Sequence, residues 1–340
     1  MSGKAGVRMR AIVVREFGGP EVLRIEQVPD PVPGAGQLLV EVAAAGIQFI
    51  ETQTRTGVLQ GVSPVAPRGL PWTPGREVAG VVTAVGDEVD ADQWLGRRVA
   101  GLTPGADGGG YASLALVEAA AAHPLPETLG YPEAVSLLGT GRTALGLVEM
   151  AEVGKGDTVL IESAAGAVGV LAIQLARAAG ADRIIGLARG AEKLALVRQF
   201  GADAAVDYTA ADWPEQVRAA APEGVSVVFD AIGGDIGARA FELLADGGRF
   251  LVFGFSSGTM TKPDPAAVTA RNINNLSYFG PAAGPRGPQT QLRQSRDVIA
   301  AAAEGRLRPF VGRTFPLEQA EAAHTAITAR ATVGKTVLEP

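Results

Sequence analysis

The chain has 340 residues, of which 47% are hydrophobic and 19% are charged, and this length and apolar content suit two globular domains. The formal net charge is −6, and because the 30 basic and 36 acidic residues form no blocks of one sign, the sequence favours no nucleic-acid or membrane partner. No segment approaches the roughly 18 apolar residues of a membrane helix, and residues 1–8 resemble a loose leader rather than a secretion signal. We therefore expect a cytoplasmic globular protein.

Cysteine is absent, and there are only two histidines, His123 and His324. The lack of cysteine excludes disulfides, thiolate zinc sites and cysteine nucleophiles. We interpret the two histidines as surface or packing residues and expect no bound metal.

The predicted elements change character along the chain. Short strands separated by turns are expected at 10–14, 38–42 and 78–85, which indicates an antiparallel or mixed β domain. From about residue 131, helices alternate with short apolar strands at 158–161, 183–187, 225–230, 249–254 and 275–279. Helices at 289–304 and 317–328 and a strand at 335–338 complete the chain. This order predicts an α/β protein in which a β domain accompanies a doubly wound parallel sheet.

A glycine turn follows the strand at 158–161. It reads Ala164-Ala165-Gly166-Ala167-Val168-Gly169 and leads into a helix that ends before Gly180. Gly166 allows the backbone to approach a pyrophosphate, and Gly169 allows the helix to pack close to the strand. The helix N-terminus presents free N–H groups to the phosphates. The turn therefore predicts a dinucleotide site in which Ala164 replaces the usual first glycine.

The end of the next strand indicates which dinucleotide binds. An enzyme for NAD would carry Asp or Glu there for the ribose 2′-hydroxyl, whereas this chain has Arg189 and, four residues later, Lys193. A guanidinium and an ammonium group suit a 2′-phosphate, so we predict NADPH as the cofactor. The alternative is that both cations only solvate a loop and the following helix.

Segments along nearly the whole chain resemble the zinc-independent quinone oxidoreductases of the medium-chain dehydrogenase/reductase superfamily. The matching segments are Glu16–Leu23, Ala44–Ile47, Thr73–Gly75, Val78–Val82, Gly109–Ala112, the glycine turn, Gly201–Asp203, Phe229–Gly234, Phe253–Gly254, Ser256–Gly258 and Gly334–Leu338. The resemblance implies a GroES-like substrate domain, residues 1–131 and 284–340, and a Rossmann NADP(H)-binding domain, residues 132–283.

Several cofactor contacts follow from the resemblance alone. It implies that Lys193, Tyr208 and Arg330 contact the 2′-phosphate and that Thr143 lies close to the nicotinamide. Gly254 is also assigned to the cofactor site. Zinc-dependent relatives have histidine at the position of Arg76, so the resemblance agrees with the expected absence of metal.

The substrate residues depart from the family pattern. Where relatives have Asn-x-x-Asp-x-Tyr, this chain has Gln48, Glu51 and Gln53, and the following segment 62–71 is expanded. We name Gln48, Gln53 and Tyr111 as candidate catalytic hydrogen-bond donors. The role of Arg142, beside Thr143, is not predicted.

The expected reaction is hydride transfer from NADPH to a quinone or another small α,β-unsaturated carbonyl compound, without zinc. Two alternatives stay open: an enoyl reductase of polyketide or lipid metabolism, and a non-catalytic NADPH-binding protein. The apolar strand at 275–279 predicts a homodimer, because an unprotected sheet edge invites pairing.

Overall fold

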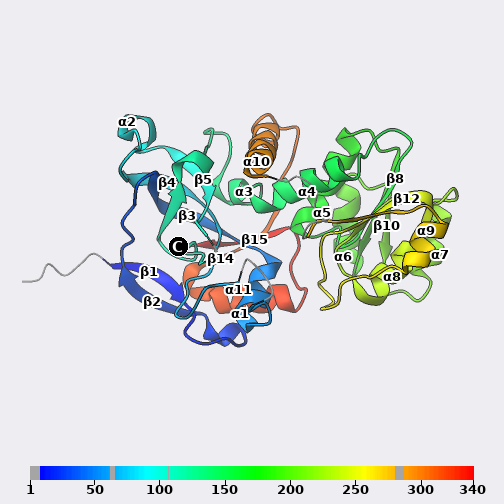
Figure 1. Cartoon of the computed structure of the whole chain (residues 1–340), viewed down its shortest axis with the longest axis horizontal. Coiled ribbons are helices and arrows are strands. Elements are labelled where there is room, and N and C mark those ends of the chain that lie inside the picture. Colours follow the sequence, from blue (N-terminus) through cyan, green and yellow to red (C-terminus); the bar gives the residue numbers. More distant parts are fainter. Residues whose placement is uncertain (1–7, 62–65, 106, 280–286) are drawn as a thin grey trace, which may run out of the picture. The chain divides into compact units, whose positions relative to one another are not determined.

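The computed structural model describes residues 8–61, 66–105, 107–279 and 287–340. The expectation of a loose leader and part of the expanded 62–71 segment lie outside these residues. The chain forms two compact units, Met1–Gly139 with Phe310–Pro340, and Thr140–Pro309 (Figure 1). No helix among the described residues is long and apolar enough to cross a membrane.

The first unit is built on β-sheet. Its strands are β1 (Arg8–Val13), β2 (Arg24–Pro29), β3 (Gln37–Ile47), β4 (Glu77–Val85), β5 (Arg98–Leu102), β6 (Leu114–Glu118), β7 (His123–Pro124), β14 (Val311–Pro316) and β15 (Lys335–Glu339). The larger sheet has the order β14-β15-β3-β4-β5-β7, with β6 on β3, while β1 and β2 form a separate antiparallel pair. The long strand β3 therefore holds three neighbours, with β6 beside its first half and β15 beside its end.

Short helices accompany this sheet in the first unit. They are α1 (Phe49–Thr56), α2 (Ala91–Trp94), α3 (Tyr131–Val135) and α11 (Ala320–Thr328), with 3₁₀ turns at Pro20–Val22, Ala119–Ala121 and Leu317–Gln319. The expected helix at 317–328 is thus a 3₁₀ turn followed by an α-helix. Alternate residues of β3, Leu38, Val40 and Val42, enter one apolar core with side chains from α11 and β15. This period of two is what fixes the inward face of the strand.

The second unit is a doubly wound sheet. Its strands are β8 (Thr158–Ile161), β9 (Arg183–Ala188), β10 (Ala204–Asp207), β11 (Val225–Asp230), β12 (Leu244–Val252) and β13 (Asn274–Ser277). All pairs are parallel, in the order β10-β9-β8-β11-β12-β13. This is the 3-2-1-4-5-6 order of the Rossmann fold, in which ligands bind at the carboxyl ends where the order reverses, here between β8 and β11.

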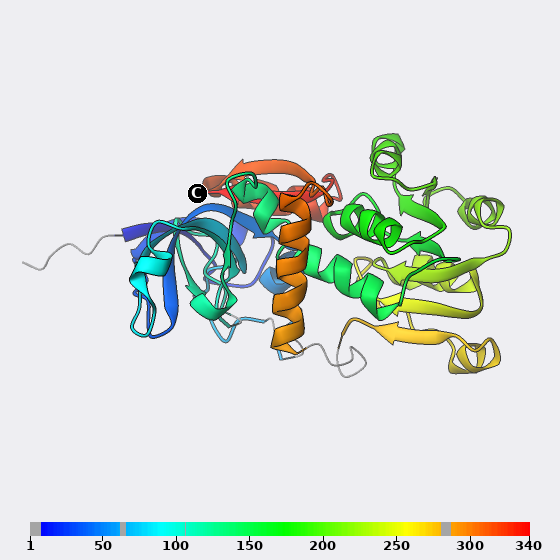
Figure 2. The same cartoon turned by 90° about the horizontal axis from the view of Figure 1, so that it is seen from above.

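Helices flank this sheet on both sides (Figure 1). The helices of this unit are α4 (Gly139–Met150), α5 (Ala167–Ala178), α6 (Ala191–Gln199), α7 (Trp213–Ala220), α8 (Gly234–Glu242), α9 (Pro265–Ala270) and α10 (Pro288–Ala303). Of these, α10 does not lie on the sheet and is hydrogen-bonded to Glu149 of α4 through Arg293 and Gln294. Trp213 of α7 and Phe241 of α8 share one core with Leu160, Val228 and Phe250 of the sheet. Strand β13 lies at the open edge (Figure 2).

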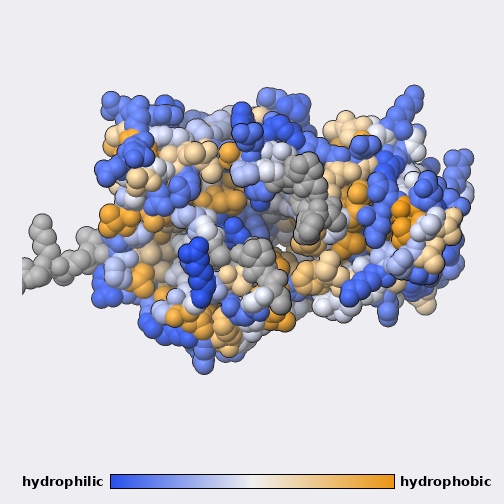
Figure 3. Space-filling view, in the orientation of Figure 1, coloured by the Kyte–Doolittle hydropathy of each residue, from blue (hydrophilic) through white to orange (hydrophobic). Residues whose placement is uncertain are grey.

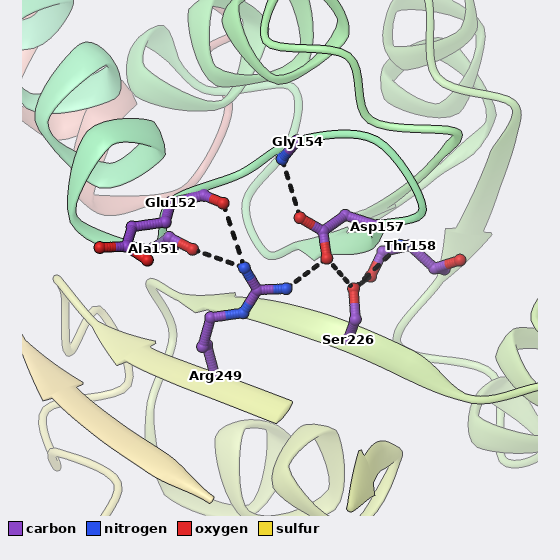
Figure 4. A network of polar contacts seen from close by, with 7 residues as sticks. All are labelled: Ala151, Glu152, Gly154, Asp157, Thr158, Ser226 and Arg249. Carbon is purple, nitrogen blue, oxygen red and sulfur yellow. Dashed lines mark hydrogen bonds and ion pairs between the residues drawn. The ribbon is translucent and has the colours of Figure 1, made fainter. Parts of the chain in front are cut away.

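A polar network ties the amino ends of the central strands together (Figure 4). Arg249 of β12 forms an ion pair with Asp157 and donates to the carbonyl oxygens of Ala151 and Glu152 at 2.8 and 3.2 Å. The Ser226 hydroxyl donates to the same Asp157 oxygen at 2.7 Å. The network lies opposite the carboxyl ends of the strands, so it serves stability rather than ligand binding.

Hydrophilic and hydrophobic residues are interspersed on the face of the molecule seen in Figure 3. This distribution agrees with the absence of long charge runs in the sequence.

Candidate functional site

The glycine turn lies at the carboxyl end of β8. Gly166 is the N-cap residue of α5, so the first N–H groups of that helix lie directly beyond the turn. A methyl group on Gly169 would lie 2.6 Å from the Cα of Ala164, which leaves no room for any residue larger than glycine. The structure therefore has the close helix–strand packing that the sequence predicted.

Gly186 on the neighbouring strand explains why Ala164 can replace the first glycine of the turn. Ala164 is fully buried, and its N–H donates to the Leu187 carbonyl oxygen of β9 at 2.9 Å. A Cβ atom on Gly186 would lie only 2.8 Å from the Ala164 methyl. Because Gly186 of β9 has no side chain, there is space for the Ala164 methyl group.

The predicted 2′-phosphate residues of the second unit lie just beyond the carboxyl ends of two neighbouring strands, β9 and β10. Arg189 directly follows β9, and Tyr208 directly follows β10, with its N–H donating to the Ala188 carbonyl oxygen at 3.3 Å. The two strands are parallel and in register, Ala188 beside Asp207, so both residues leave the sheet at the same end. Lys193 is the third residue of α6, which begins just beyond Arg189.

Hydrogen bonds of Asp207 fix the loops that follow β9 and β10. Its carboxylate accepts from the Gly190 N–H at 2.9 Å and from the Thr209 N–H and hydroxyl at 2.9 and 2.6 Å. The Thr209 hydroxyl is the main reason why the pKa of Asp207 lies below its usual value, and Arg189 contributes to the same shift. Sequence reasoning missed this acid, which fixes the loop that carries Arg189 through its hydrogen bond with Gly190.

The remaining predicted cofactor residues are distributed over both units. Thr143 and the neighbouring Arg142 are half-buried on α4, and Gly254 follows β12, where a Cβ atom would lie 2.5 Å from the Ala231 carbonyl oxygen. Arg330 belongs to the first unit, after α11, and has a left-handed backbone with φ 56°.

A buried carboxyl pair at the β8/β11 switch point was not foreseen. Glu162 accepts from the N–H groups of Ala231 and Ile232 at 3.1 and 2.8 Å, and Asp230 accepts from Gly233 N–H at 2.8 Å. Burial, followed by the charge of Asp230, holds the pKa of Glu162 well above its usual value. The pair fixes the loop after β11 beside the glycine turn through these backbone hydrogen bonds.

In the first unit, Gln48 belongs to a chain of polar contacts. Its Nε2 donates to Glu77 Oε1 at 2.8 Å, and the same oxygen accepts from Gly139 N–H at 2.7 Å. The other oxygen of Glu77 pairs with Lys335, and both of these charged side chains are buried. Because a carboxylate can only accept, the amide nitrogen of Gln48 must point toward Glu77.

Two glycines make room for these contacts. A Cβ atom on Gly139 would lie 2.4 Å from Gln48 Nε2, and one on Gly46 would lie 2.5 Å from Glu77 Oε2. Gly46 falls within the Ala44–Ile47 segment, but neither glycine was named as a site residue.

A second set of buried polar contacts in this unit joins Glu51 of α1 to Tyr111 and His324. Glu51 Oε2 accepts from the Gln48 backbone N–H and from the Tyr111 hydroxyl, both at 2.8 Å, and Tyr111 lies 3.1 Å from His324 Nε2. All three side chains are buried. Burial raises the pKa of Glu51 to about 7 and lowers that of His324 to about 3, and the Arg55 charge adds to the latter shift.

The three predicted catalytic residues differ in accessibility. Gln48 is half-buried, and Gln53, on α1, is half-buried with its Oε1 enclosed. Tyr111 is fully buried, and its hydroxyl donates to Glu51. Glu51 and Glu77, which are hydrogen-bonded to Tyr111 and Gln48, were not named as site residues, although both lie within or beside the segments discussed for the resemblance.

A GroES-like β unit and a Rossmann unit with a dinucleotide turn define a medium-chain dehydrogenase/reductase. The model of the alcohol dehydrogenase GroES-like domain matches residues 34–127, and that of the zinc-binding dehydrogenase matches residues 167–294. Curated relatives include the quinone oxidoreductases of Rattus norvegicus, 33% identical with 94% of each chain covered, and of Homo sapiens, 32% identical with 97% covered. The chain belongs to the quinone oxidoreductase family of this superfamily, so the predicted family and fold class are confirmed.

Solved structures give the same result. The Escherichia coli quinone oxidoreductase complexed with NADPH is 28% identical, with a TM-score of 0.86 and coverage of 97% of this chain and 100% of that chain. A mycobacterial protein complexed with NADPH is 34% identical, also with a TM-score of 0.86, and covers 98% of this chain.

The donor set of this chain does not fit the zinc ion that one domain model names. Gln48 donates to Glu77, Glu77 pairs with Lys335, and Arg76 cannot act as a ligand. The described residues include no cluster of three or more His, Cys, Asp or Glu side chains that could hold a metal ion.

Proposed function

We propose that the protein is an NADPH-dependent oxidoreductase that transfers hydride to a quinone or another small α,β-unsaturated carbonyl compound. The observation that carries the proposal is the position of Arg189 and Tyr208 just beyond the carboxyl ends of β9 and β10, with Lys193 at the start of α6 and the glycine turn after the neighbouring strand β8. The NADPH complexes of related structures support the choice of cofactor.

Both charged and neutral groups at this edge suit NADPH. The Arg189 guanidinium and the Lys193 ammonium meet the 2′-phosphate, and the Tyr208 hydroxyl donates to it. The free N–H groups of α5 meet the pyrophosphate. When bound, NADPH supplies the hydride, and the protein holds the cofactor and orients the acceptor.

Gln48 is the proposed hydrogen-bond donor for the acceptor. One Nε2 hydrogen is directed to Glu77, which is itself held by Lys335 and Gly139, so the amide plane is fixed before substrate binds. The second Nε2 hydrogen then stabilises negative charge on the acceptor oxygen as hydride arrives. Glu77 and Lys335 are positioning residues in this scheme, and no zinc takes part.

Phe49 supports a planar apolar acceptor. It follows Gln48 directly, is the first residue of α1, and is 39% exposed. An exposed aromatic side chain next in sequence to the proposed amide donor is available to pack against a conjugated ring that carries a carbonyl group.

Steady-state assays test the proposal. With NADPH, we expect turnover of 1,4-benzoquinone that exceeds turnover of a crotonyl thioester. Faster reduction of the thioester would instead assign an enoyl reductase of polyketide or lipid metabolism. Binding of NADPH without turnover of either acceptor would indicate a non-catalytic NADPH-binding protein.

A further inference from the structure

Glu51, Tyr111 and His324 form a continuous line of hydrogen-bonding groups inside the first unit. Glu51 lies on α1, Tyr111 shortly before β6, and His324 on α11, so three separate parts of the chain contribute. The two links measure 2.8 Å from Tyr111 to Glu51 and 3.1 Å from Tyr111 to His324. The side chains are 3%, 0% and 0% exposed.

Each end of this line has a polar atom without a protein partner. Glu51 Oε1 and His324 Nδ1 are buried, and neither has a hydrogen-bond partner among the described residues. Glu51 Oε2, in contrast, already accepts two bonds. Buried polar atoms are usually hydrogen-bonded to protein or to ordered water, so each end of the line can take one further hydrogen-bond partner.

From this geometry we propose that Glu51 gives the proton that completes reduction of the acceptor, and that Tyr111 and His324 return a proton to Glu51. The inference rests on the proposed function. Hydride transfer to a quinone converts NADPH to NADP⁺ and leaves a hydroquinone monoanion, which needs one proton. Glu51 loses that proton from Oε1 through water and becomes a carboxylate.

Return of the proton requires no charged histidine. His324 takes a proton on Nδ1, its Nε2 proton moves to the Tyr111 oxygen, and the Tyr111 proton moves to Glu51 Oε2. His324 is neutral before and after, with its proton moved from one nitrogen to the other. Exchange with water then returns the His324 proton to Nε2 and the Glu51 proton to Oε1, which restores the starting state for the next turnover. This agrees with the low pKa of His324 and with the raised pKa of Tyr111, which burial and then Glu51 cause. Glu51 is then the member that changes charge near neutral pH.

Three charged side chains, Glu77, Lys335 and Arg55, influence the pKa values along this line of hydrogen bonds. Glu77 on β4 raises the pKa of Glu51 and Lys335 on β15 lowers it, but burial is the largest effect. The charge of Arg55 on α1 lowers the pKa of both Tyr111 and His324. None of these neighbours lies between Glu51 and Tyr111 in the line of hydrogen bonds.

The test is the pH profile of kcat for 1,4-benzoquinone. In the parent protein kcat should fall above pH about 7, because the protonated form of Glu51 is the donor. Glu51→Gln, which keeps the shape but cannot ionise, should lower kcat at pH 6 at least about tenfold and remove this limb. Glu26→Gln on β2 is the matched control and should keep both the rate and the limb.

Tyr111→Phe separates a proton path from a packing role. The tyrosine hydroxyl lowers the pKa of Glu51, so its loss should move the limb to higher pH while kcat decreases. An unchanged limb in both Glu51→Gln and Tyr111→Phe would overturn the inference.

Infrared spectroscopy provides a readout that does not depend on turnover. The parent should show a carboxyl band that titrates near pH 7 and is absent in Glu51→Gln; if that variant does not fold, Tyr111→Phe should shift the same band. No such band would overturn the inference. Failure of the parent to reduce any quinone or enone would overturn the proposed function instead.

Discussion

At the scale of single residues, the buried carboxyl of Glu51 makes stability depend on pH. Its pKa rises from 4.5 to about 7 on folding, so its stabilising contribution is full below pH 4.5 and is lost as pH rises through 7. The loss amounts to about 3 kcal/mol. Relative to the parent, Glu51→Gln should therefore gain about 3 kcal/mol of unfolding free energy between pH 4 and pH 8.

Urea unfolding at the two pH values measures this difference. The control Glu26→Gln carries the same chemical change, but the pKa of Glu26 is lowered, mainly by its hydrogen bond with Arg15. It should show no gain at pH 8. An equal stability difference for Glu51→Gln at both pH values would contradict the raised pKa.

Gly169 is the residue at which the cofactor turn tolerates least change. A methyl group there would meet backbone atoms of Ala164 and Ser163 at 2.6 Å, which cannot move aside as a side chain can. Gly169→Ala should cost about 1–3 kcal/mol of stability and weaken NADPH binding. Gly154→Ala is the control, since its methyl meets nothing within 4 Å, and fluorescence titration with NADPH gives the affinity. Unchanged affinity in Gly169→Ala would contradict the role of this turn.

The residues also show where sequence reasoning reaches its limit. The spacing of Gly166, Gly169 and Arg189 predicts a turn and a cation at one sheet edge because strand, turn and helix are local in sequence. Glu51, Tyr111 and His324 are brought together only by the fold, from positions up to 273 residues apart. No local sequence pattern therefore predicts that these three side chains form one hydrogen-bonded group.

At the scale of elements, the network around Arg249 joins the end of α4 to β8, β11 and β12 (Figure 4). Arg249→Met would leave the Asp157 carboxylate, which is 10% exposed, without its cation. We expect a loss of about 3 kcal/mol in urea unfolding, with NADPH affinity unchanged. Arg306→Met removes an exposed pair with Glu304 and should cost less than about 1 kcal/mol. Equal effects of the two substitutions would contradict the structural role.

Element boundaries were predicted best where one chemical signal dominates. Strands 158–161 and 225–230 agree with β8 and β11 residue by residue, because turn residues bound each short apolar run. Strand β12 begins at Leu244 instead of Arg249 and ends at Val252, since Phe253 and Gly254 turn their N–H groups to the Asp230 carbonyl oxygen. Helix α1 was not predicted, because its sequence is largely polar and no apolar period marks it.

At the scale of the whole molecule, the open edge of β13 predicts a homodimer in which two copies of this strand pair antiparallel. Tyr278 N–H donates to Val252 of β12 at 2.8 Å, so the neighbouring Ser277 N–H points away from β12 toward the open edge. Ser277→Pro should thus weaken the dimer without breaking the β12–β13 ladder. Ser277→Ala keeps the N–H group and serves as the control.

Light scattering at micromolar concentration determines the mass. A mass near the 34.8 kDa of one chain for the parent protein would contradict the dimer. The same measurement on Ser277→Pro and Ser277→Ala then tests whether β13 forms the interface.

The overall architecture followed from the sequence, because alternating strands and helices admit few arrangements. Boundaries between the domains were expected after residues 131 and 283, and the compact units of the structure divide after residues 139 and 309. The second difference concerns α10, which belongs to the Rossmann unit. Its sequence contains no feature that assigns it to one sheet rather than the other.

The central claim, hydride transfer from NADPH, depends on the cations at the β9/β10 edge. Its most direct test is kcat/KM for 1,4-benzoquinone reduction with NADPH and with NADH, in the parent, in Lys193→Ala and in the control Lys155→Ala, an exposed lysine before β8. We predict a preference for NADPH of at least about tenfold in the parent and the control, since one charge-assisted phosphate contact contributes more than about 1.4 kcal/mol, and a reduced preference in Lys193→Ala. Equal efficiency with both cofactors in the parent would contradict the account.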